Sequence, residues 1–305
     1  MPDVSTAWVF PGQGSQESGM GRDLYEAYAV ARELYDRADS VLDRPLSRLC
    51  FDGPDGELSK TTNAQPAIYV TSLACLAVAR EAAALPHAPA FVAGHSLGEY
   101  TALAAAGAVG FDDGLRLVEQ RGKLTQAAAD ATPGGLAAVL GLDDATAEAV
   151  CAAAGAEVCN INSPGQLVIG GSKDAVAKAC ALAVERGARR AIPLDVGGAF
   201  HTSLMAPAAA GMREAVDAIE VRAPAIPVVA NDRGSAITDP AEIRTELVYQ
   251  LTHPVRWVQC VEYMGQHGVT EFIEIGPGRV LTGLIKRIAK DAHVRNINGV
   301  ASLST

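Results

Sequence analysis

AFVAGHSLGEYTALAAAG, residues 90–107, is the stretch of sequence that decides the fold. The apolar run from Ala90 to Ala93 predicts a short strand, and the small side chains from Thr101 to Gly107 predict a helix. The Gly94-His95-Ser96-Leu97-Gly98 turn between them has the Gly-x-Ser-x-Gly spacing of a nucleophile elbow, which pushes a serine hydroxyl outward. That string alone is common in ordinary turns. Its strand–turn–helix setting makes Ser96 the candidate nucleophile.

The segments around this stretch also alternate between strands, turns and helices. We expect a strand at 6–10 ending in the loop PGQGSQ (11–16), one helix face over 24–41, a long helix from 63 toward 85, and a helix that opens near 112. Pro66 is expected in the first turn of the long helix, and Pro86 and Pro89 to end it. This alternation is typical of an α/β fold with a parallel sheet covered on both faces.

Residues 133–196 follow a different order. We expect strands at 136–140, 157–161, 166–169 and 189–194, with helices at 143–154 and from the capping residue Ser172 to Arg186. The order β-α-β-β-α-β is that of a ferredoxin-like unit. The prediction is therefore a discontinuous large domain, 1–132 and 197–305, into which a small domain, 133–196, is inserted.

After residue 196 the α/β character returns. Helices are expected at 201–219, 240–251 and 256–267, and a strand at 271–275 leads through Gly276-Pro277-Gly278 into a helix with Lys286, Arg287 and Lys290.

Composition narrows the class of protein. The 305 residues carry a net charge of −10, which argues against general nucleic-acid binding, and 49% are hydrophobic, enough for a sizeable core. No apolar run is long enough to span a membrane and the start lacks the basic region of a secretory signal. The six cysteines are scattered without a CxxC pair, as expected of buried thiols and not of a metal site. We expect a soluble, cytoplasmic monomer that uses no metal or cofactor.

A nucleophilic serine needs a base, and the sequence offers six histidines. His95 adjoins Ser96 on a sharp turn, where neighbouring side chains diverge, so a structural role is expected for it. His87, His267 and His293 lie in polar or helix-end settings typical of a surface. His201 follows the flexible run Gly197-Gly198-Ala199-Phe200 and is favoured modestly over His253.

Seven strings along the chain resemble the malonyl-CoA:acyl carrier protein transacylase family. In the order of the family they are PGQGSQ (11–16), GHSLGEY (94–100), QRGK (120–123), NSPGQ (162–166), GAFHTSLM (198–205), QLTHPVRW (250–257) and EIGPGRVLTGL (274–284). The resemblance covers nearly the whole chain. It implies a hydrolase-like large domain with a ferredoxin-like insertion.

The resemblance also assigns roles to individual residues. It implies that Ser96 is acylated by malonyl-CoA, that His201 is the base, and that the backbone carbonyl of Gln250 orients the imidazole in place of an aspartate. It further implies an oxyanion hole made by the N–H groups of Gln13 and Leu97, and an Arg121 that pairs with the malonyl carboxylate.

Each of these residues also has an ordinary explanation. Arg121 on an amphipathic helix would by itself be read as a solvated charge, and Gln250 as a helix C-cap. The Gln13 loop is compatible with a phosphate cradle, although it lacks the Gly-Lys-Ser/Thr of a P-loop. Asn162 is expected to shape the cleft between the domains, although an Asn before Ser-Pro-Gly also suits a turn.

Specificity and partner follow from the same resemblance. Phe200 before His201 resembles the signature of malonyl-selective domains, in which a bulky ring excludes an α-methyl branch. Thr125 and Leu136 depart from the methionines of many relatives. The implied acyl carrier protein is acidic, so a local basic surface should steer it. The candidates are Lys286, Arg287, Lys290, Arg189 and Arg190.

Two other functions remain open. A serine esterase or thioesterase would use the same elbow with Asp232 or Asp239 and one of His253, His267 and His293, but the chain has no HGGG-type oxyanion motif. A non-catalytic docking module would predict degraded motifs, and these motifs are intact.

Overall fold

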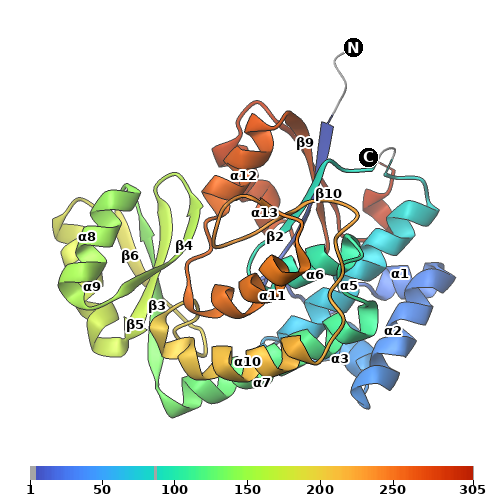
Figure 1. The fold of residues 1–305 in the computed structure, drawn as a ribbon, viewed down its shortest axis with the longest axis horizontal. Helices are drawn as coiled ribbons and strands as arrows, with labels where there is room; N and C mark the ends of the chain where they lie inside the picture. The colour runs from blue at the N-terminus through green and yellow to red at the C-terminus, as the bar shows by residue number, and fades with distance from the viewer. Residues whose placement is uncertain (1–4, 86–87, 305) are drawn as a thin grey trace.

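The computed structural model describes residues 5–85 and 88–304 and contains two separate sheets (Figure 1). The larger has the strand order β10-β9-β1-β2-β7-β8, parallel except for the β7–β8 pair. Its strands are β1 (Ser5–Phe10), β2 (Phe91–Gly94), β7 (Val228–Val229), β8 (Ala236–Ile237), β9 (Val269–Ile275) and β10 (His293–Ile297). The α/β class predicted from the alternation of elements is confirmed.

The central pair of this sheet positions the site. β1 and β2 are parallel neighbours in a register that sets Phe10 opposite Gly94. Both strands therefore end at the same edge, and the loop after β1 lies beside the elbow after β2. In open parallel sheets this carboxyl edge is where ligands bind.

Helices cover both faces of the sheet. The helices outside residues 133–196, some of which pack on other helices and not on the sheet itself, are α1 (Arg22–Ala27), α2 (Ala29–Leu42), α3 (Leu46–Asp52), α4 (Asp55–Leu58), α5 (Thr61–Glu81), α6 (Leu97–Ala105), α7 (Phe111–Ala131), α10 (Ala206–Asp217), α11 (Pro240–Tyr249), α12 (Trp257–Gln266) and α13 (Val280–Ile288). Short 3-10 turns occupy Ser203–Met205, Gln250–Thr252 and Val300–Ser302.

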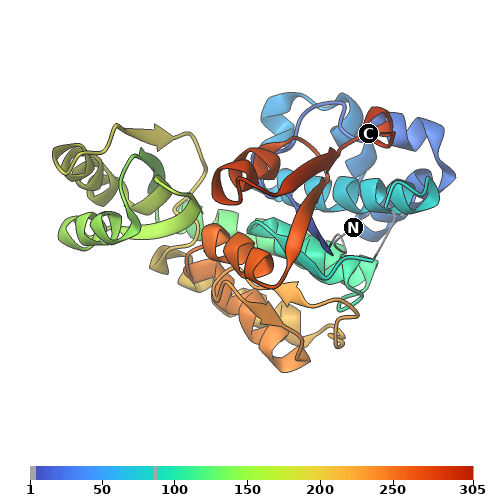
Figure 2. The ribbon, with the colours of Figure 1, turned by 90° about the horizontal axis from the view of Figure 1, so that it is seen from above.

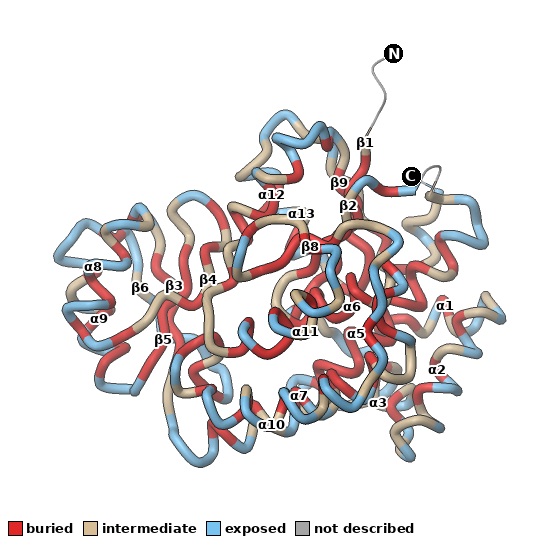
Figure 3. Tube along the Cα trace, viewed as in Figure 1, coloured by how far each residue is buried: buried red, intermediate tan, exposed pale blue. Residues whose placement is uncertain are grey.

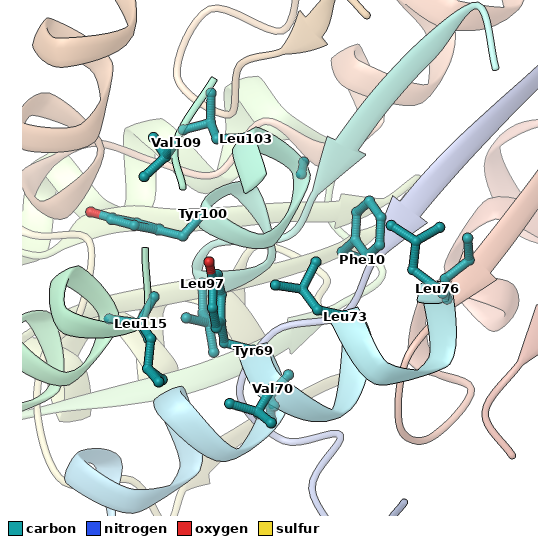
Figure 4. Packing of buried hydrophobic residues seen from close by; sticks show 14 of the residues in the cluster. Phe10, Tyr69, Val70, Leu73, Leu76, Leu97, Tyr100, Leu103, Val109 and Leu115 are labelled. Atoms are coloured by element: carbon teal, nitrogen blue, oxygen red, sulfur yellow. The ribbon is translucent and has the colours of Figure 1, made fainter. Parts of the chain in front are cut away.

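Helix α5 lies in the middle of the main core. Most of its side chains are buried, and the tube in Figure 3 is red along it while the outer faces of α2, α8 and α9 are exposed. Tyr69 and Leu73 of α5 pack with Leu97 and Tyr100 of α6 and Phe10 of β1 (Figure 4). Close packing over this large apolar area is what holds α6, and with it the elbow, against the sheet.

The second sheet has the antiparallel order β4-β5-β3-β6, as a ferredoxin-like unit requires. Its elements are β3 (Gly134–Leu140), α8 (Asp144–Ala154), β4 (Glu157–Ser163), β5 (Gln166–Ser172), α9 (Lys173–Glu185) and β6 (Arg190–Leu194), and they stand to one side of the large sheet (Figure 2). Ser172 caps α9 through its side chain, as predicted, and Asp143 caps α8 in the same way. The predicted ferredoxin-like order is thus confirmed.

Some predicted elements are wrong in detail. The helix expected over 24–41 is two helices, because Tyr28 between them is extended, with φ −127° and ψ 128°. Leu24 and Ala31 are nevertheless both fully buried. A single extended residue keeps the apolar spacing of one helix face, so periodicity could not detect the break.

Pro66 lies in the interior of α5 and not in its first turn, because α5 begins at Thr61. A proline has no N–H to give to the carbonyl four residues earlier, here that of Thr62. The Arg44 side chain replaces that donor: its Nη2 donates to the Thr62 carbonyl at 3.3 Å and its Nη1 to Asn63 at 2.8 Å.

Other differences concern the ends of elements. The helix expected from His201 begins only at Ala206, and α13 ends at Ile288, before Lys290. Strands β7, β8 and β10 were not predicted, since two of them have two residues each. Pro86 and His87 lie outside the described residues. Within 5–85 and 88–304, no helix is both long and apolar enough to cross a membrane, and no cluster of metal-ligating side chains occurs.

Candidate active site

Ser96 lies at a strained turn directly before α6. Its φ of 53° and ψ of −108° fall in a region that residues with a side chain rarely adopt. A Cβ added to Gly94 would lie 1.9 Å from the Gly98 backbone, so only glycine permits this approach of strand and helix. The Ser96 N–H donates to Asn231 Oδ1 at 2.6 Å, which anchors the turn. The expected elbow is present, and the structure starts α6 at Leu97, earlier than predicted.

The imidazole of His201 lies against the hydroxyl group of Ser96. Its Nε2 lies 2.7 Å from Ser96 Oγ, and its Nδ1 lies 2.8 Å from the Gln250 carbonyl and 3.1 Å from the His253 carbonyl. Carbonyl oxygens only accept, so Nδ1 carries a proton and Nε2 is free to accept one from the hydroxyl. Burial, with the charge of Arg121 added, lowers the pKa of His201 to about 3, which keeps the imidazole neutral at physiological pH.

Arg121 is buried beside the serine, with 5% of its surface exposed. Its Nη2 donates to Ser96 Oγ at 3.0 Å and to Gln250 Oε1 at 3.1 Å, and its Nη1 donates to Gln65 Oε1 at 2.7 Å. The guanidinium carbon also lies 5.3 Å from the centre of the Tyr100 ring. None of these partners is an anion, so the cation is held in place without a counter-charge in direct contact.

The loop after β1 is pressed against the elbow. A Cβ on Gly12 would come 2.4 Å from the His95 carbonyl, and the Gln13 side chain donates to Thr61 Oγ1 at 3.1 Å. Leu97 is the first residue of α6, where a backbone N–H has no acceptor within the helix. Both residues predicted for the oxyanion hole therefore lie next to Ser96 in the fold.

A cleft of about 500 Å³ opens onto these groups between the two sheets. Ser96, His201 and Arg121 line it from the large sheet's side. Leu136 and Phe200 also line the cleft. Both pack in one apolar cluster with Val168 of β5, in which Leu136 and Val168 are buried. Leu136 therefore bears on the shape of the acyl site, whereas Thr125 is bonded to the Arg121 carbonyl at 2.8 Å and is not among the lining residues.

Asn162 is not among the residues that line the cleft, but it contacts one of them. Its Oδ1 is 2.8 Å from Nε2 of His95, which does line the cleft, and the His95 ring stands edge-on to Trp257, so Asn162 supports the elbow through His95. The asparagine that lines the cleft is Asn160, two residues earlier on the same face of β4.

Several residues of the site carried no strong sequence signal. Asn231 holds three groups around the elbow: its side chain bonds Ser96 N and the Gly94 carbonyl, and its own N–H donates to Glu99. It is a polar residue directly after the short apolar run 228–230, at the carboxyl edge of the sheet, and that position was the available signal. Glu99 lies within the string GHSLGEY (94–100), but the string assigned it no role, and Gln65 and Glu246 sit inside helices and had no signal.

The five basic residues predicted for docking are exposed and lie outside the cleft lining. Arg287 Nη1 donates to Gln166 Oε1 at 2.6 Å, so α13 reaches the β4–β5 turn of the small sheet. The Arg189 side chain lies over Gly141, whose N–H bonds the carbonyl of Gly165 in that same turn. Arg189 and Arg287 therefore border one segment, although they are far apart in sequence.

A strained serine, a neutral histidine and a buried arginine at the carboxyl edge of a parallel sheet define a serine acyltransferase. Residues 7–303 match the acyl transferase domain family. The chain is 45% identical over 287 residues to a malonyl CoA-acyl carrier protein transacylase of Bacillus subtilis, covering 92% of this chain and 90% of that protein.

Solved structures agree with this match. An acyl carrier protein S-malonyltransferase of Vibrio cholerae superposes with a TM-score of 0.95 at 45% identity, covering 99% of both chains. A malonyl-transacylase in complex with its type II PKS acyl-carrier protein superposes with a TM-score of 0.94 at 42% identity, over 99% of this chain and 98% of that one. This chain belongs to the malonyl CoA-acyl carrier protein transacylase family.

Proposed function

We propose that this enzyme transfers a malonyl group from malonyl-CoA to the phosphopantetheine thiol of an acyl carrier protein, through an ester on Ser96. The observation that carries the proposal is the triangle around one hydroxyl: Ser96 Oγ lies 2.7 Å from the base nitrogen of His201 and 3.0 Å from a guanidinium nitrogen of Arg121. A nucleophile, a base and a fixed cation are the groups that an acyl donor with a free carboxylate requires.

In the first half-reaction Ser96 Oγ attacks the thioester carbonyl carbon while His201 Nε2 takes the hydroxyl proton. The oxyanion of the tetrahedral intermediate is stabilised by the N–H groups of Gln13 and Leu97. The carbon–sulfur bond then breaks, the coenzyme A sulfur receives the proton from His201, and malonyl-Ser96 remains.

The second half-reaction runs in the opposite direction with another thiol. The thiol of the carrier protein gives its proton to His201 and attacks the ester carbonyl, and the Ser96 oxygen leaves and regains the proton. Both halves use one site, so ping-pong kinetics are expected.

Arg121 explains why the donor is a malonyl group. The carboxylate of malonate is two bonds from the acyl carbon, and the Arg121 guanidinium is within one hydrogen bond of Ser96 Oγ. In the acylated state the carboxylate takes over those N–H donors in a bidentate pair. A planar guanidinium held by Gln65 and Gln250 is prepared for that geometry.

A serine esterase with an acidic triad fits the site less well. Nδ1 of His201 bonds two backbone carbonyls, and Asp239 is used as the N-cap of α11. His267 bonds the Tyr263 carbonyl and His293 lies beside Glu271, both away from Ser96. Release of free malonate, compared with transfer to a carrier protein, separates hydrolysis from transfer.

The carrier protein, the cell compartment and the division into domains belong to the same proposal. The carrier protein docks on the basic surface of Lys286, Arg287, Lys290, Arg189 and Arg190. The chain acts as a cytoplasmic monomer, and its units are 1–132 with 197–305 and the inserted 133–196. The continuous contact from α13 to the β4–β5 turn supports docking across both units.

Intact-mass analysis tests the covalent step. Malonyl-CoA should add the mass of one malonyl group to the protein, and a phosphopantetheinylated carrier protein should then remove it. Ser96→Ala should remain unlabelled, whereas Ser59→Ala, a serine that also lines the cleft, should be labelled normally. Labelling of Ser96→Ala would refute the assignment.

A further inference from the structure

Glu99 is a fully buried carboxyl group directly behind the nucleophile elbow. It is the third residue of α6, and its Oε2 accepts from Gln250 Nε2 at 2.9 Å and from the Asn231 N–H at 3.0 Å. Both donors also hold Ser96: Gln250 Nε2 donates to the Ser96 carbonyl at 3.1 Å, and Asn231 Oδ1 accepts from the Ser96 N–H at 2.6 Å. One oxygen of Glu99 therefore joins the two groups that clamp the serine backbone.

The same oxygen sets the orientation of the Gln250 amide. Arg121 can only donate, so the atom of Gln250 that faces it must be the oxygen, and the amide nitrogen must face the opposite way. Glu99 supplies the acceptor that this nitrogen needs. Because the Gln250 backbone carbonyl also bonds His201, Gln250 touches all three groups proposed to act on the acyl donor.

The second oxygen of Glu99 is buried without a partner, and another buried acid is its neighbour. Glu99 Oε1 has no hydrogen-bond partner among the described residues, and the carboxyl of Glu246, 3% exposed, lies near that of Glu99, because the two accept from the consecutive backbone N–H groups of Asp232 and Asn231. Glu246 Oε1 in turn accepts from the Asp232 N–H at 3.0 Å. Two neighbouring buried carboxylates repel each other, and a proton on one of them removes this repulsion and allows it to donate to the other. Burial and mutual repulsion raise the pKa of Glu99 well above its usual range, and burial also raises that of Glu246.

We propose that Glu99 is a positioning residue for malonyl recognition, which aligns Arg121 and the serine elbow through Gln250 and Asn231, and that it is held in place by one proton shared with Glu246. The inference rests on the proposed function, because alignment of Arg121 matters only for an acyl donor with a carboxylate. Glu99 itself touches neither substrate nor the reacting atoms.

A matched pair of substitutions tests the acceptor role. Glu99→Gln keeps an oxygen for Gln250 and Asn231 and puts an NH₂ group in place of Oε1, the oxygen without a partner, whereas Glu99→Met has the same length and no acceptor. We expect Glu99→Gln to retain Ser96 acylation by malonyl-CoA within about threefold, and Glu99→Met to lose on the order of 10²-fold, as a misplaced group does. Acylation by acetyl-CoA should fall less, so the malonyl-to-acetyl ratio should drop about tenfold or more in Glu99→Met alone.

A double-mutant cycle tests the shared proton. Glu246→Gln also keeps its oxygen for the Asp232 N–H and points its NH₂ at Glu99. Each single amide therefore faces a carboxylate, but in the Glu99→Gln/Glu246→Gln double variant two NH₂ groups face each other. We expect the urea midpoint of each single variant to lie near that of the wild type. The midpoint of the double variant should be lowered by much more than the sum of the two single shifts.

Each outcome decides a separate statement. If the wild type is not labelled by malonyl-CoA, the proposed function fails. If it is labelled and folded Glu99→Met keeps the wild-type malonyl-to-acetyl ratio, the positioning role alone is refuted. A folded Glu99→Gln that loses malonyl acylation also refutes it, even if Glu99→Met does not fold. Additive midpoints in the double-mutant cycle overturn the shared proton.

Discussion

Replacement of Arg121 by alanine removes the cation from the acyl site and leaves the nucleophile and the base in place. Arg121 lies on the buried face of α7, and its guanidinium donates hydrogen bonds to Gln65 and Gln250 at 2.7 and 3.1 Å. We expect the variant to lose acylation by malonyl-CoA and to gain acylation by acetyl-CoA. The reason is that an unpaired buried guanidinium penalises a donor without a carboxylate.

The size of the effect follows from the hydrogen bonds that the carboxylate would make. A bidentate pair supplies two bonds between charged groups, each worth about 1.5–3 kcal/mol, so its loss costs about 3–6 kcal/mol of transition-state stabilisation. At about 1.4 kcal/mol per factor of ten, kcat/KM for malonyl-CoA should fall about 10²- to 10⁴-fold. The malonyl-to-acetyl ratio should change by more than that, because the two rates move in opposite directions.

Competition between malonyl-CoA and acetyl-CoA, read by intact mass, measures this ratio directly. Arg116→Ala is the matched control, since Arg116 lies on the same helix with 57% of its side chain exposed. Its ion pair with Asp113 is long, with an N–O distance of 3.8 Å. Acetyl labelling of the Arg121→Ala protein shows that Ser96 and His201 remain competent. An unchanged preference for malonyl-CoA in that active protein would refute the assignment of Arg121.

Four further outcomes are expected. Because the pKa of His201 is about 3, kcat/KM for acylation should stay constant as the pH falls to about 5. In Arg121→Ala, where one cause of the low pKa is gone, the fall of kcat/KM on the acid side should move to higher pH. A fall near pH 6.5 in the wild type would contradict this. His201 also predicts how stability depends on pH. Its imidazole titrates near 6.5 in the unfolded chain and at about 3 in the folded one, so the unfolded chain binds more protons between these pH values. The contribution of His201 to the free energy of unfolding should therefore decrease as the pH falls through that window, and urea titrations of the wild type and His201→Gln would measure it. Phe200→Ser should raise the methylmalonyl-to-malonyl ratio about tenfold or more by enlarging the cleft wall, and equal ratios would show that another side chain excludes the methyl branch. Charge reversal of Lys286 and Arg287 should raise KM for the carrier protein while acylation by malonyl-CoA is unchanged, and a parallel loss of acylation would place these residues in the site and not on a docking surface.

Much of the fold was predictable because its signals are local. The elbow needs only an apolar strand, two glycines and a run of small residues, all within 90–107, and the ferredoxin-like order follows from short alternating elements. The break at Tyr28 was not predictable, since one extended residue preserves the helical spacing of Leu24 and Ala31. Nor was the interior position of Pro66, which depends on a donor from Arg44, 18 residues before the carbonyl it bonds.

The candidate site was predictable only in part. Ser96 follows from its motif, and His201 was favoured only modestly over His253. Arg121 by itself suited a solvated helix face, and only the resemblance to a family indicated otherwise; the structure buries it against Ser96. Asn231 belongs to no motif, and Glu99, although it lies within the string GHSLGEY (94–100), received no role from it.

The sequence by itself determined the nucleophile, the class of fold and the family, because these are written in strings of neighbouring residues and in the spacing of apolar side chains. Only the tertiary structure decided which polar groups are buried together. Hydrogen bonds that span 25 to 154 residues of sequence join Ser96, Arg121, His201 and Gln250. The two buried acids Glu99 and Glu246 are also far apart in sequence. The pKa values of Arg121, His201, Glu99 and Glu246 depend on how much water the packed core removes from them, and no local pattern records that quantity.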